Sequence, residues 1–307
     1  MRVNLSVKIG KLKLKNPVMV ASGTFGYAEE FKGFINLKKL GAIVTKTITL
    51  NPRRGNPPAR TCETPSGMLN SIGLENPGLG AFLKDKLPFL EKLGIPIIMS
   101  IASEDGPKEF IELVKRLDKL KAVSALELNI SCPNVMGQKS LISQDCQATY
   151  SIVKSIRRMT AKTLITKLSP NVTCIGDLAK AAEDAGSDGL ALINTLSGMS
   201  INTEKQNPRL AAVVGGLSGP AIRPVALKMV WEAYNKIKIP IIGMGGIIDT
   251  PSALEFFIAG ASAISIGTAN FINPRVSVEI ISGLGGYLKR KKIKDIHSLT
   301  GSLIYES

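Results

Sequence analysis

Residues 127–138, ELNISCPNVMGQ, place a thiol shortly after an apolar run ends. The run ends at Asn129, Cys132 comes three residues later, and a proline follows it directly. A cysteine in this position can fill space, bind a metal, form a disulfide or take part in a reaction. A free thiol has a pKa of about 8.5 that its surroundings can shift, so it can act as a base near neutral pH.

The other cysteines and the histidine narrow this choice. Cys62, Cys146 and Cys174 form no CxxC pair and no metal-ligand spacing with Cys132, and His297 is the only histidine. A zinc site and a Ser-His-Asp triad are therefore excluded, and no metal is predicted. We expect reduced thiols, with the three cysteines other than Cys132 acting as buried space fillers.

The composition is that of a globular protein rather than a membrane protein. The chain has 307 residues, 44% hydrophobic, and no apolar run approaches the roughly 20 residues of a membrane span. The N-terminus lacks the continuous apolar centre of a signal peptide. We therefore expect a cytoplasmic protein that does not bind membranes.

Short apolar runs alternate with amphipathic segments along most of the chain. Near-continuous apolar strands are typical of a parallel sheet covered on both faces. The predicted strands are 17–22, 41–46, 96–101, 125–130, 163–168, 189–195, 240–246 and 263–268, and predicted helices include 108–120, 151–159, 175–186 and 251–261.

This alternation predicts an α/β fold, a closed (β/α)8 TIM barrel formed by one domain over 1–307. An open doubly wound sheet is the alternative, but no GxGxxG follows the first strand. The start of the chain predicts a β-hairpin, with arms at 3–7 and 11–15, that caps the lower mouth of the barrel. Segments 50–78 and 196–218 are predicted to be long loops at the opposite, C-terminal mouth.

The predicted strand ends carry polar residues and glycines that would meet at this C-terminal mouth, where TIM barrels place their chemistry. In order, the ends are Ser22, Lys46, Ser100, Asn129, Lys167, Asn194 with Thr195, Gly245 with Gly246, and Gly267 with Thr268. The last two, in GMGG and IGT, are glycine turns that lead toward helices. Exposed backbone N–H groups at such turns predict a phosphate cradle, and hence a phosphorylated substrate or cofactor.

The two lysines allow two interpretations. One lysine could form a Schiff base, as in an aldolase, or a fixed cation could stabilise the negative charge of a reduced flavin. The net charge of +15 also raises the question of nucleic acid. Because aromatic residues make up only 5% of the chain, stacking surfaces for bases are scarce, and we expect no nucleic-acid binding.

Several longer motifs resemble the dihydroorotate dehydrogenase family, and the resemblance runs essentially end to end. The motifs are KNPVMVASGTFGY (15–27), NSIGLENPG (70–78), NISCPN (129–134), INTLSG (193–198), GGLSGPAIRP (215–224), GMGGI (243–247) and ISIGTA (264–269). The pattern NPRRGNPPAR followed by NSIGLENPG is most similar to class 1B, whose catalytic subunit passes electrons through an iron–sulfur flavoprotein subunit to NAD.

The resemblance implies one FMN per chain and a catalytic cysteine. The expected FMN contacts are Ser22, Lys46, Thr47, Ser100, Asn129, Lys167, Ile193, Gly219, Gly245, Gly246, Gly267 and Thr268. The expected substrate contacts are Lys46, Asn70, Ser71, Ile72, Gly73, Leu74, Asn129, Asn134, Asn194 and Thr195. Cys132 matches the catalytic base of class 1; the membrane-linked class 2 has a serine there.

The activity implied is oxidation of dihydroorotate to orotate in pyrimidine biosynthesis. Cys132 would remove the C5 proton, and the C6 hydride would pass to flavin N5. A homodimer would join the electron-transfer subunit as a heterotetramer, with FAD and the 2Fe–2S cluster only in that partner. Two departures from the family pattern are Ser100, where the family usually has asparagine, and the lid 135–144, which is shortened and lacks a glycine pair.

Three other enzymes remain as alternatives. Two are flavin enzymes that would share the barrel, namely a class 1A fumarate-linked dihydroorotate dehydrogenase and a dihydropyrimidine dehydrogenase-like enzyme. The third is the Schiff-base aldolase, which rests on the lysines alone.

Overall fold

The computed structural model describes residues 2–103, 106–130 and 144–305. Cys132, Asn134 and residues 135–143 of the expected lid lie outside the described residues. The cavity and the strands that lead to it are within them.

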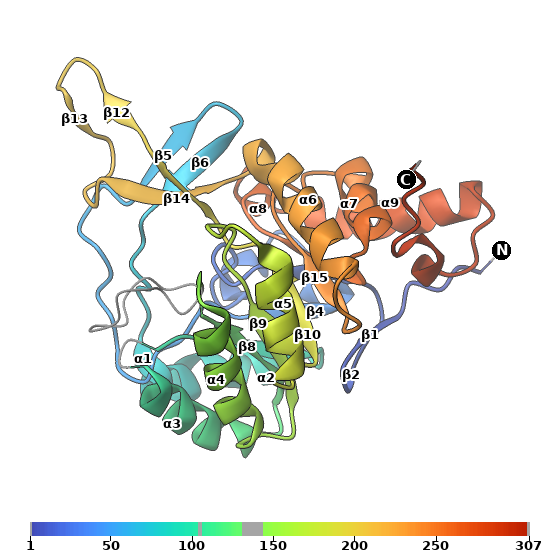
Figure 1. The fold of residues 1–307 in the computed structure, drawn as a ribbon, viewed down its shortest axis with the longest axis horizontal. Coiled ribbons are helices and arrows are strands. Elements are labelled where there is room, and N and C mark those ends of the chain that lie inside the picture. Colours follow the sequence, from blue (N-terminus) through green and yellow to red (C-terminus); the bar gives the residue numbers. More distant parts are fainter. Residues whose placement is uncertain (1, 104–105, 131–143, 306–307) are drawn as a thin grey trace.

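Eight parallel strands form a closed barrel, which confirms the predicted fold (Figure 1). Neighbours around the barrel follow the order β10-β15-β16-β3-β4-β7-β8-β9. The strands are β3 (Val18–Val20), β4 (Ala42–Val44), β7 (Ile97–Ile101), β8 (Val123–Asn129), β9 (Thr163–Lys167), β10 (Gly189–Leu192), β15 (Ile241–Gly243) and β16 (Ala263–Ile266). Each lies within or overlaps a predicted apolar run.

Burial on both faces explains why these runs become barrel strands. Every residue of β7 and of β9 is buried, so one face fills the barrel interior and the other packs against helices. The register pairs Asn129 at the end of β8 with Lys167 at the end of β9. The polar ends of neighbouring strands are therefore brought to the same rim.

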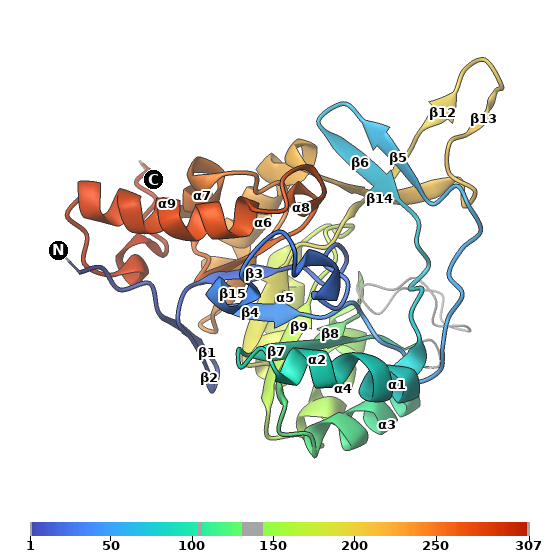
Figure 2. The same ribbon diagram turned by 180° about the vertical axis from the view of Figure 1, so that it is seen from behind.

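Helices surround the barrel, and in the two opposite views of Figures 1 and 2 α9 runs beside α7. The longer helices are α3 (Pro107–Asp118), α4 (Cys146–Arg157), α5 (Ile175–Asp184), α6 (Arg223–Tyr234), α7 (Thr250–Ala259) and α9 (Val276–Arg290). Shorter ones are α1 (Gly78–Ala81), α2 (Leu87–Glu91) and α8 (Ala269–Ile272), with a π-helical segment, Phe82–Lys86, joining α1 to α2. Of the described helices, none is both long enough and apolar enough to cross a bilayer.

The predicted N-terminal hairpin exists, but its first arm lies later than expected. β1 (Val7–Ile9) pairs antiparallel with β2 (Leu12–Leu14), whereas the prediction began the first arm at residue 3. Residues before β1 instead follow the other end of the chain, where the Asn4 amide N–H donates to the Lys294 carbonyl over 2.8 Å.

The hairpin lies at the N-terminal ends of the barrel strands, as predicted. The turn at Gly10 has a φ of +54°, and a Cβ there would lie 2.6 Å from the Cβ of Asp188, just before β10. The Lys11 amide donates to the Thr163 hydroxyl, at the start of β9, over 3.0 Å. The hairpin therefore closes the end of the barrel opposite the C-terminal mouth.

The two predicted long loops are not simple loops, because together they form a small antiparallel sheet. Its order is β11-β14-β6-β5, and Figure 1 shows it standing apart from the barrel strands. The strands are β5 (Thr61–Thr64), β6 (Gly67–Asn70), β11 (Leu196–Met199) and β14 (Val214–Ser218), and β12 (Ile201–Asn202) pairs with β13 (Asn207–Pro208) as a separate hairpin. We call the four-stranded unit the cover sheet. Its strands are short, and three of the four contain glycine, which is why no strand pattern stood out.

The N-terminus of α7 provides a test of the local sequence signals. The Asp249 carboxylate accepts a hydrogen bond from the Ser252 amide over 2.8 Å, and the Asp249 amide donates to the Ser252 hydroxyl over 3.0 Å. Asp249→Ala should lower the free energy of unfolding in urea by about 1 kcal/mol, because a helix amide loses its cap. Asp249→Asn keeps an acceptor and serves as the control. Equal stability of Asp249→Ala and wild type would contradict the assignment.

Candidate functional site

A cavity of about 620 Å³ opens at the C-terminal mouth of the barrel. All predicted strand ends except that of β7 line it. Every expected contact residue within the described chain also lines it, again except Ser100: Ser22, Lys46, Thr47, Asn70, Ser71, Ile72, Gly73, Leu74, Asn129, Lys167, Ile193, Asn194, Thr195, Gly219, Gly245, Gly246, Gly267 and Thr268. The structure thus gathers residues that lie as far apart in the sequence as Ser22 and Thr268.

Ser100 does not line the cavity, contrary to the prediction. Its side chain is fully buried, and its hydroxyl lies 2.9 Å from the hydroxyl of Thr47. Thr47 does line the cavity and also lies 3.5 Å from the Asn129 amide nitrogen that donates to it. Ser100 therefore lies behind the cavity wall and contacts Thr47, which forms part of that wall.

Two ammonium groups enter the cavity. Lys167 is only 5% exposed, and its Nζ lies 3.4 Å from the Ser22 hydroxyl oxygen, while Lys46 is half-buried. A buried charge is costly unless other groups compensate it. The pair therefore gives the cavity a strong preference for an anionic ligand.

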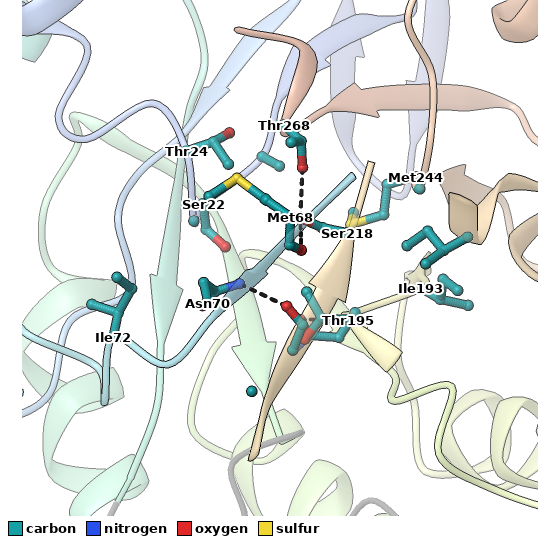
Figure 3. Close-up of a pocket in the computed structure, with 18 of the residues that line it drawn as sticks. Ser22, Thr24, Met68, Asn70, Ile72, Ile193, Thr195, Ser218, Met244 and Thr268 are labelled. Atoms are coloured by element: carbon teal, nitrogen blue, oxygen red, sulfur yellow. Dashed lines mark hydrogen bonds between the residues drawn. The ribbon is translucent and has the colours of Figure 1, made fainter. Parts of the chain in front are cut away.

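The glycine turns after β15 and β16 line the cavity, where the sequence predicts a phosphate cradle. Gly246 has a φ of +73°, and a Cβ there would lie 2.9 Å from the Gly219 carbonyl oxygen. On the facing side, the Thr268 hydroxyl donates to the Ser218 hydroxyl over 2.8 Å (Figure 3). The absence of side chains at the glycines leaves backbone close to any group that occupies this part of the cavity.

The helix contribution to this cradle is smaller than predicted. The turn after β16 leads into α8, which has four residues, and α7 begins only at Thr250, beyond the GMGG turn. A one-turn helix adds little aligned dipole. Attraction of a phosphate here would therefore depend mainly on the glycine backbone and the hydroxyls.

The cover sheet brings the segment 70–74 to the cavity. The Asn70 side-chain amide donates to the Gly216 carbonyl of β14 over 3.3 Å, and Figure 3 shows this contact facing Thr195. Asn56 holds the next residues, since its side chain donates to the Ser71 hydroxyl over 2.7 Å and its backbone amide donates to the Ile72 carbonyl over 3.0 Å. Segment 70–74 is thus positioned before any ligand binds.

Asn171 is a cavity residue that the sequence reasoning missed. Its side-chain amide donates to the Thr195 carbonyl over 3.1 Å, and its carbonyl accepts from the Ser197 amide over 2.8 Å. It therefore connects the segment after β9 to the start of β11. Its position, four residues beyond Lys167, was the available signal.

The other cysteines do not fill the core, so that prediction was wrong. Cys146 and Cys174 are exposed, and Cys62 is half-buried on β5. Partial desolvation raises the pKa of the Cys146 thiol, and the charges of Asp177 and Asp145 raise it further. Cys146 and Cys174 are not in apolar surroundings, because each stands at the start of a helix on the surface.

Comparison with known proteins agrees with this geometry. The sequence pattern of the family described as "Dihydroorotate dehydrogenase" matches residues 4–288. Dihydroorotate dehydrogenase B (NAD(+)), catalytic subunit, of Trichlorobacter lovleyi is 52% identical over 303 residues, which cover 99% of each chain. The proteins of that name from Thermoanaerobacter pseudethanolicus and Caldicellulosiruptor bescii are each 50% identical, over 98% of this chain and 99% of theirs.

The fold and site define a (β/α)8-barrel protein with a cationic, glycine-cradled cavity at its C-terminal mouth. The chain belongs to the dihydroorotate dehydrogenase family. This membership argues against the Schiff-base aldolase and the nucleic-acid-binding protein.

Asn171 supplies a test of how the cover sheet is attached. In Asn171→Ala the Ser197 amide loses its acceptor, which is worth roughly 1 kcal/mol, so its hydrogen exchange should accelerate about fivefold. Asn171→Asp keeps an acceptor for Ser197 and loses only the donor to Thr195. Exchange at Ser197 should therefore stay near wild type in Asn171→Asp, and equal acceleration in both variants would contradict this connection.

Proposed function

We propose that the chain is the catalytic subunit of an NAD-linked dihydroorotate dehydrogenase, oxidising dihydroorotate to orotate. The observation that carries the proposal is end-to-end identity near 50% to proteins of that name, together with a cavity lined by the expected contact residues. The positive charges of Lys46 and Lys167 at the base of the cavity, which we call the cavity floor, suit a substrate with a carboxylate. The cover sheet supplies amide groups. NAD is the final electron acceptor.

The cavity fits FMN on its own geometry. The cradle at Gly246 has no room for a Cβ, and backbone N–H groups, two hydroxyls and Lys167 suit a phosphate and a ribityl chain. When bound, FMN supplies the acceptor for the hydride from C6 of the substrate. Lys46 and Lys167 hold positive charge on the floor, Thr47 and Asn129 offer hydrogen bonds, and Ile193 supplies apolar contact.

Dihydroorotate would occupy the part of the cavity under segment 70–74. Its ring amides both donate and accept, which matches the side chains of Asn70, Asn129 and Asn194. Lys46 provides the charge for its carboxylate. The Asn194 side-chain oxygen already accepts from the Thr195 amide over 2.8 Å, so its NH₂ group is oriented toward other acceptors.

Cys132 would be the base that takes the C5 proton, and Asn134 a further substrate contact. Both lie outside the described residues, and the proposal rests on NISCPN, which starts at the last residue of β8. Proton removal at C5 and hydride loss from C6 together form the C5–C6 double bond of orotate. Asn129, at the start of this motif, lines the cavity and is only 8% exposed.

The protein would act with a partner in the cytoplasm. The name of the relatives, a catalytic subunit, supports an electron-transfer partner. We assign FAD and a 2Fe–2S cluster to that partner and FMN to this chain, and we infer a homodimer that joins two partner subunits as a heterotetramer.

A comparison of electron acceptors tests the proposal. The purified chain, loaded with FMN, is mixed with dihydroorotate and then with fumarate, a quinone, or NAD, with and without the partner subunit. Orotate formation coupled to NAD should need the partner. Rapid NAD reduction by the chain alone would refute the division between subunits, whereas fumarate turnover would assign the chain to class 1A, and a dihydropyrimidine preferred over dihydroorotate would change the substrate.

Cys132 can be tested by two substitutions. Cys132→Ala should retain FMN and lose roughly 100- to 10,000-fold in turnover, the usual contribution of a general base. Cys132→Ser should recover activity only at high pH, because a hydroxyl is a much weaker acid than a thiol. Cys62→Ala is the control. Wild-type turnover of Cys132→Ala at neutral pH would show that another group is the base.

A further inference from the structure

Glu127 is a buried acidic residue to which the proposed reaction gives no role. It lies on β8 two residues before Asn129, and alternate residues of a strand point to the same side. Because Asn129 lines the cavity, Glu127 points into the barrel just below the cavity floor. It is 2% exposed and is paired in register with Ser100 and Ile165.

The carboxylate of Glu127 lacks ordinary compensation. Within the described part of the chain, its buried Oε1 has no hydrogen-bond partner. Most buried polar groups in native proteins do have one, so an exception of this kind calls for a physical explanation. An ionised carboxylate in an apolar interior is costly unless nearby positive charge or hydrogen bonds offset the loss of water.

The barrel interior at this height is polar on two opposite walls. Registers connect Ser265 on β16 to Ala42 on β4. Two residues further along β4, Val44 connects to Ala125 on β8, and Glu127 lies two residues beyond it. The path from Ser265 to Glu127 thus crosses four strand pairs and shifts by four residues toward the C-terminal strand ends. That shift is half of the eight-residue stagger of a complete TIM barrel, so Ser265 and Glu127 lie at the same height along the barrel axis. The Ser265 hydroxyl also lacks a partner among the described residues.

Positive charge lies directly above this layer. Lys167 is two residues beyond Ile165, the register partner of Glu127, and it points into the cavity with Lys46. Opposite charges in a low-dielectric interior interact more strongly, and over longer distances, than they do in water. Glu127 is thus placed to act on both ammonium groups from beneath the floor.

We propose that Glu127 is a positioning residue whose carboxylate is the counter-charge to Lys46 and Lys167. It would limit how positive the cavity floor becomes, and thereby tune both the reduction potential of the bound flavin and the affinity for the anionic product orotate. The inference rests on the proposed function for the identity of these ligands.

Glu127→Gln and Glu127→Leu remove this charge, the first with little change of shape and the second with an apolar side chain. Removing a negative charge beneath the floor favours the reduced, more negative flavin and the orotate anion. Both variants should therefore raise the midpoint potential of the flavin, measured by mediated reductive titration without substrate. Both should also lower the Kd for orotate several-fold.

Glu109→Gln is the matched control, because Glu109 is a second buried glutamate that lies away from the cavity. It accepts from the Leu50 amide over 2.9 Å and from the Ser103 hydroxyl over 3.0 Å. This variant should lose stability and leave both the potential and the orotate Kd unchanged.

Three results would overturn the proposal. They are an unchanged potential and Kd in both Glu127 variants, equal shifts in Glu109→Gln, and failure of both Glu127 variants to fold, which would assign Glu127 to the packing of the core. If the purified wild-type chain binds neither FMN nor orotate, the proposed function itself fails. If the wild type binds both and neither Glu127 variant changes the potential or the Kd, only the role of Glu127 is overturned.

Discussion

Closure of eight parallel strands into one barrel is the constraint on which the site depends. Parallel strands in a closed sheet end at a single rim, so Lys46 and Lys167 meet in one cavity although the chain separates them widely. The register matters as much as the closure. A slip of one residue along β9 would turn Lys167 from the barrel interior toward the helices. The burial of apolar strands, rather than any polar contact, therefore brings the reactive groups together and keeps them in place.

This arrangement concentrates positive charge where the dielectric is low. Lys167 is almost fully buried, and its Nζ lies 3.4 Å from the hydroxyl oxygen of Ser22. Such a site is least stable when empty, because the charge that balances it comes partly from the ligand. A carboxylate beneath the floor would relieve part of this cost permanently. If that carboxylate neutralised too much of the positive charge, the attraction for an anionic substrate would weaken. The stability of the empty site and its affinity for an anion therefore oppose each other.

How far the sequence predicts this structure depends on whether each signal is local. The barrel strands are apolar runs that can be recognised one at a time, and their order follows from the fold. The cover sheet pairs β6 with β14, some 150 residues apart, and nothing in either short strand announces the partner. Ser100 lies behind Thr47 and not at the cavity surface, because a strand end specifies the rim but not the exact height of a side chain. The role of Cys132 stays a prediction.

The cavity walls have two origins with different rigidity. The barrel rim contributes the lysines and the glycine cradle on fully buried strands. Segment 70–74 comes from the cover sheet, whose connections to the rim include single hydrogen bonds, from the Ser197 amide to the Asn171 side chain and from the Thr268 hydroxyl to the Ser218 hydroxyl. Elements held by few buried contacts open at lower free energy than core strands. Retention of a cofactor should therefore follow the stability of the barrel, whereas substrate entry and affinity should follow the looser attachment of the cover sheet.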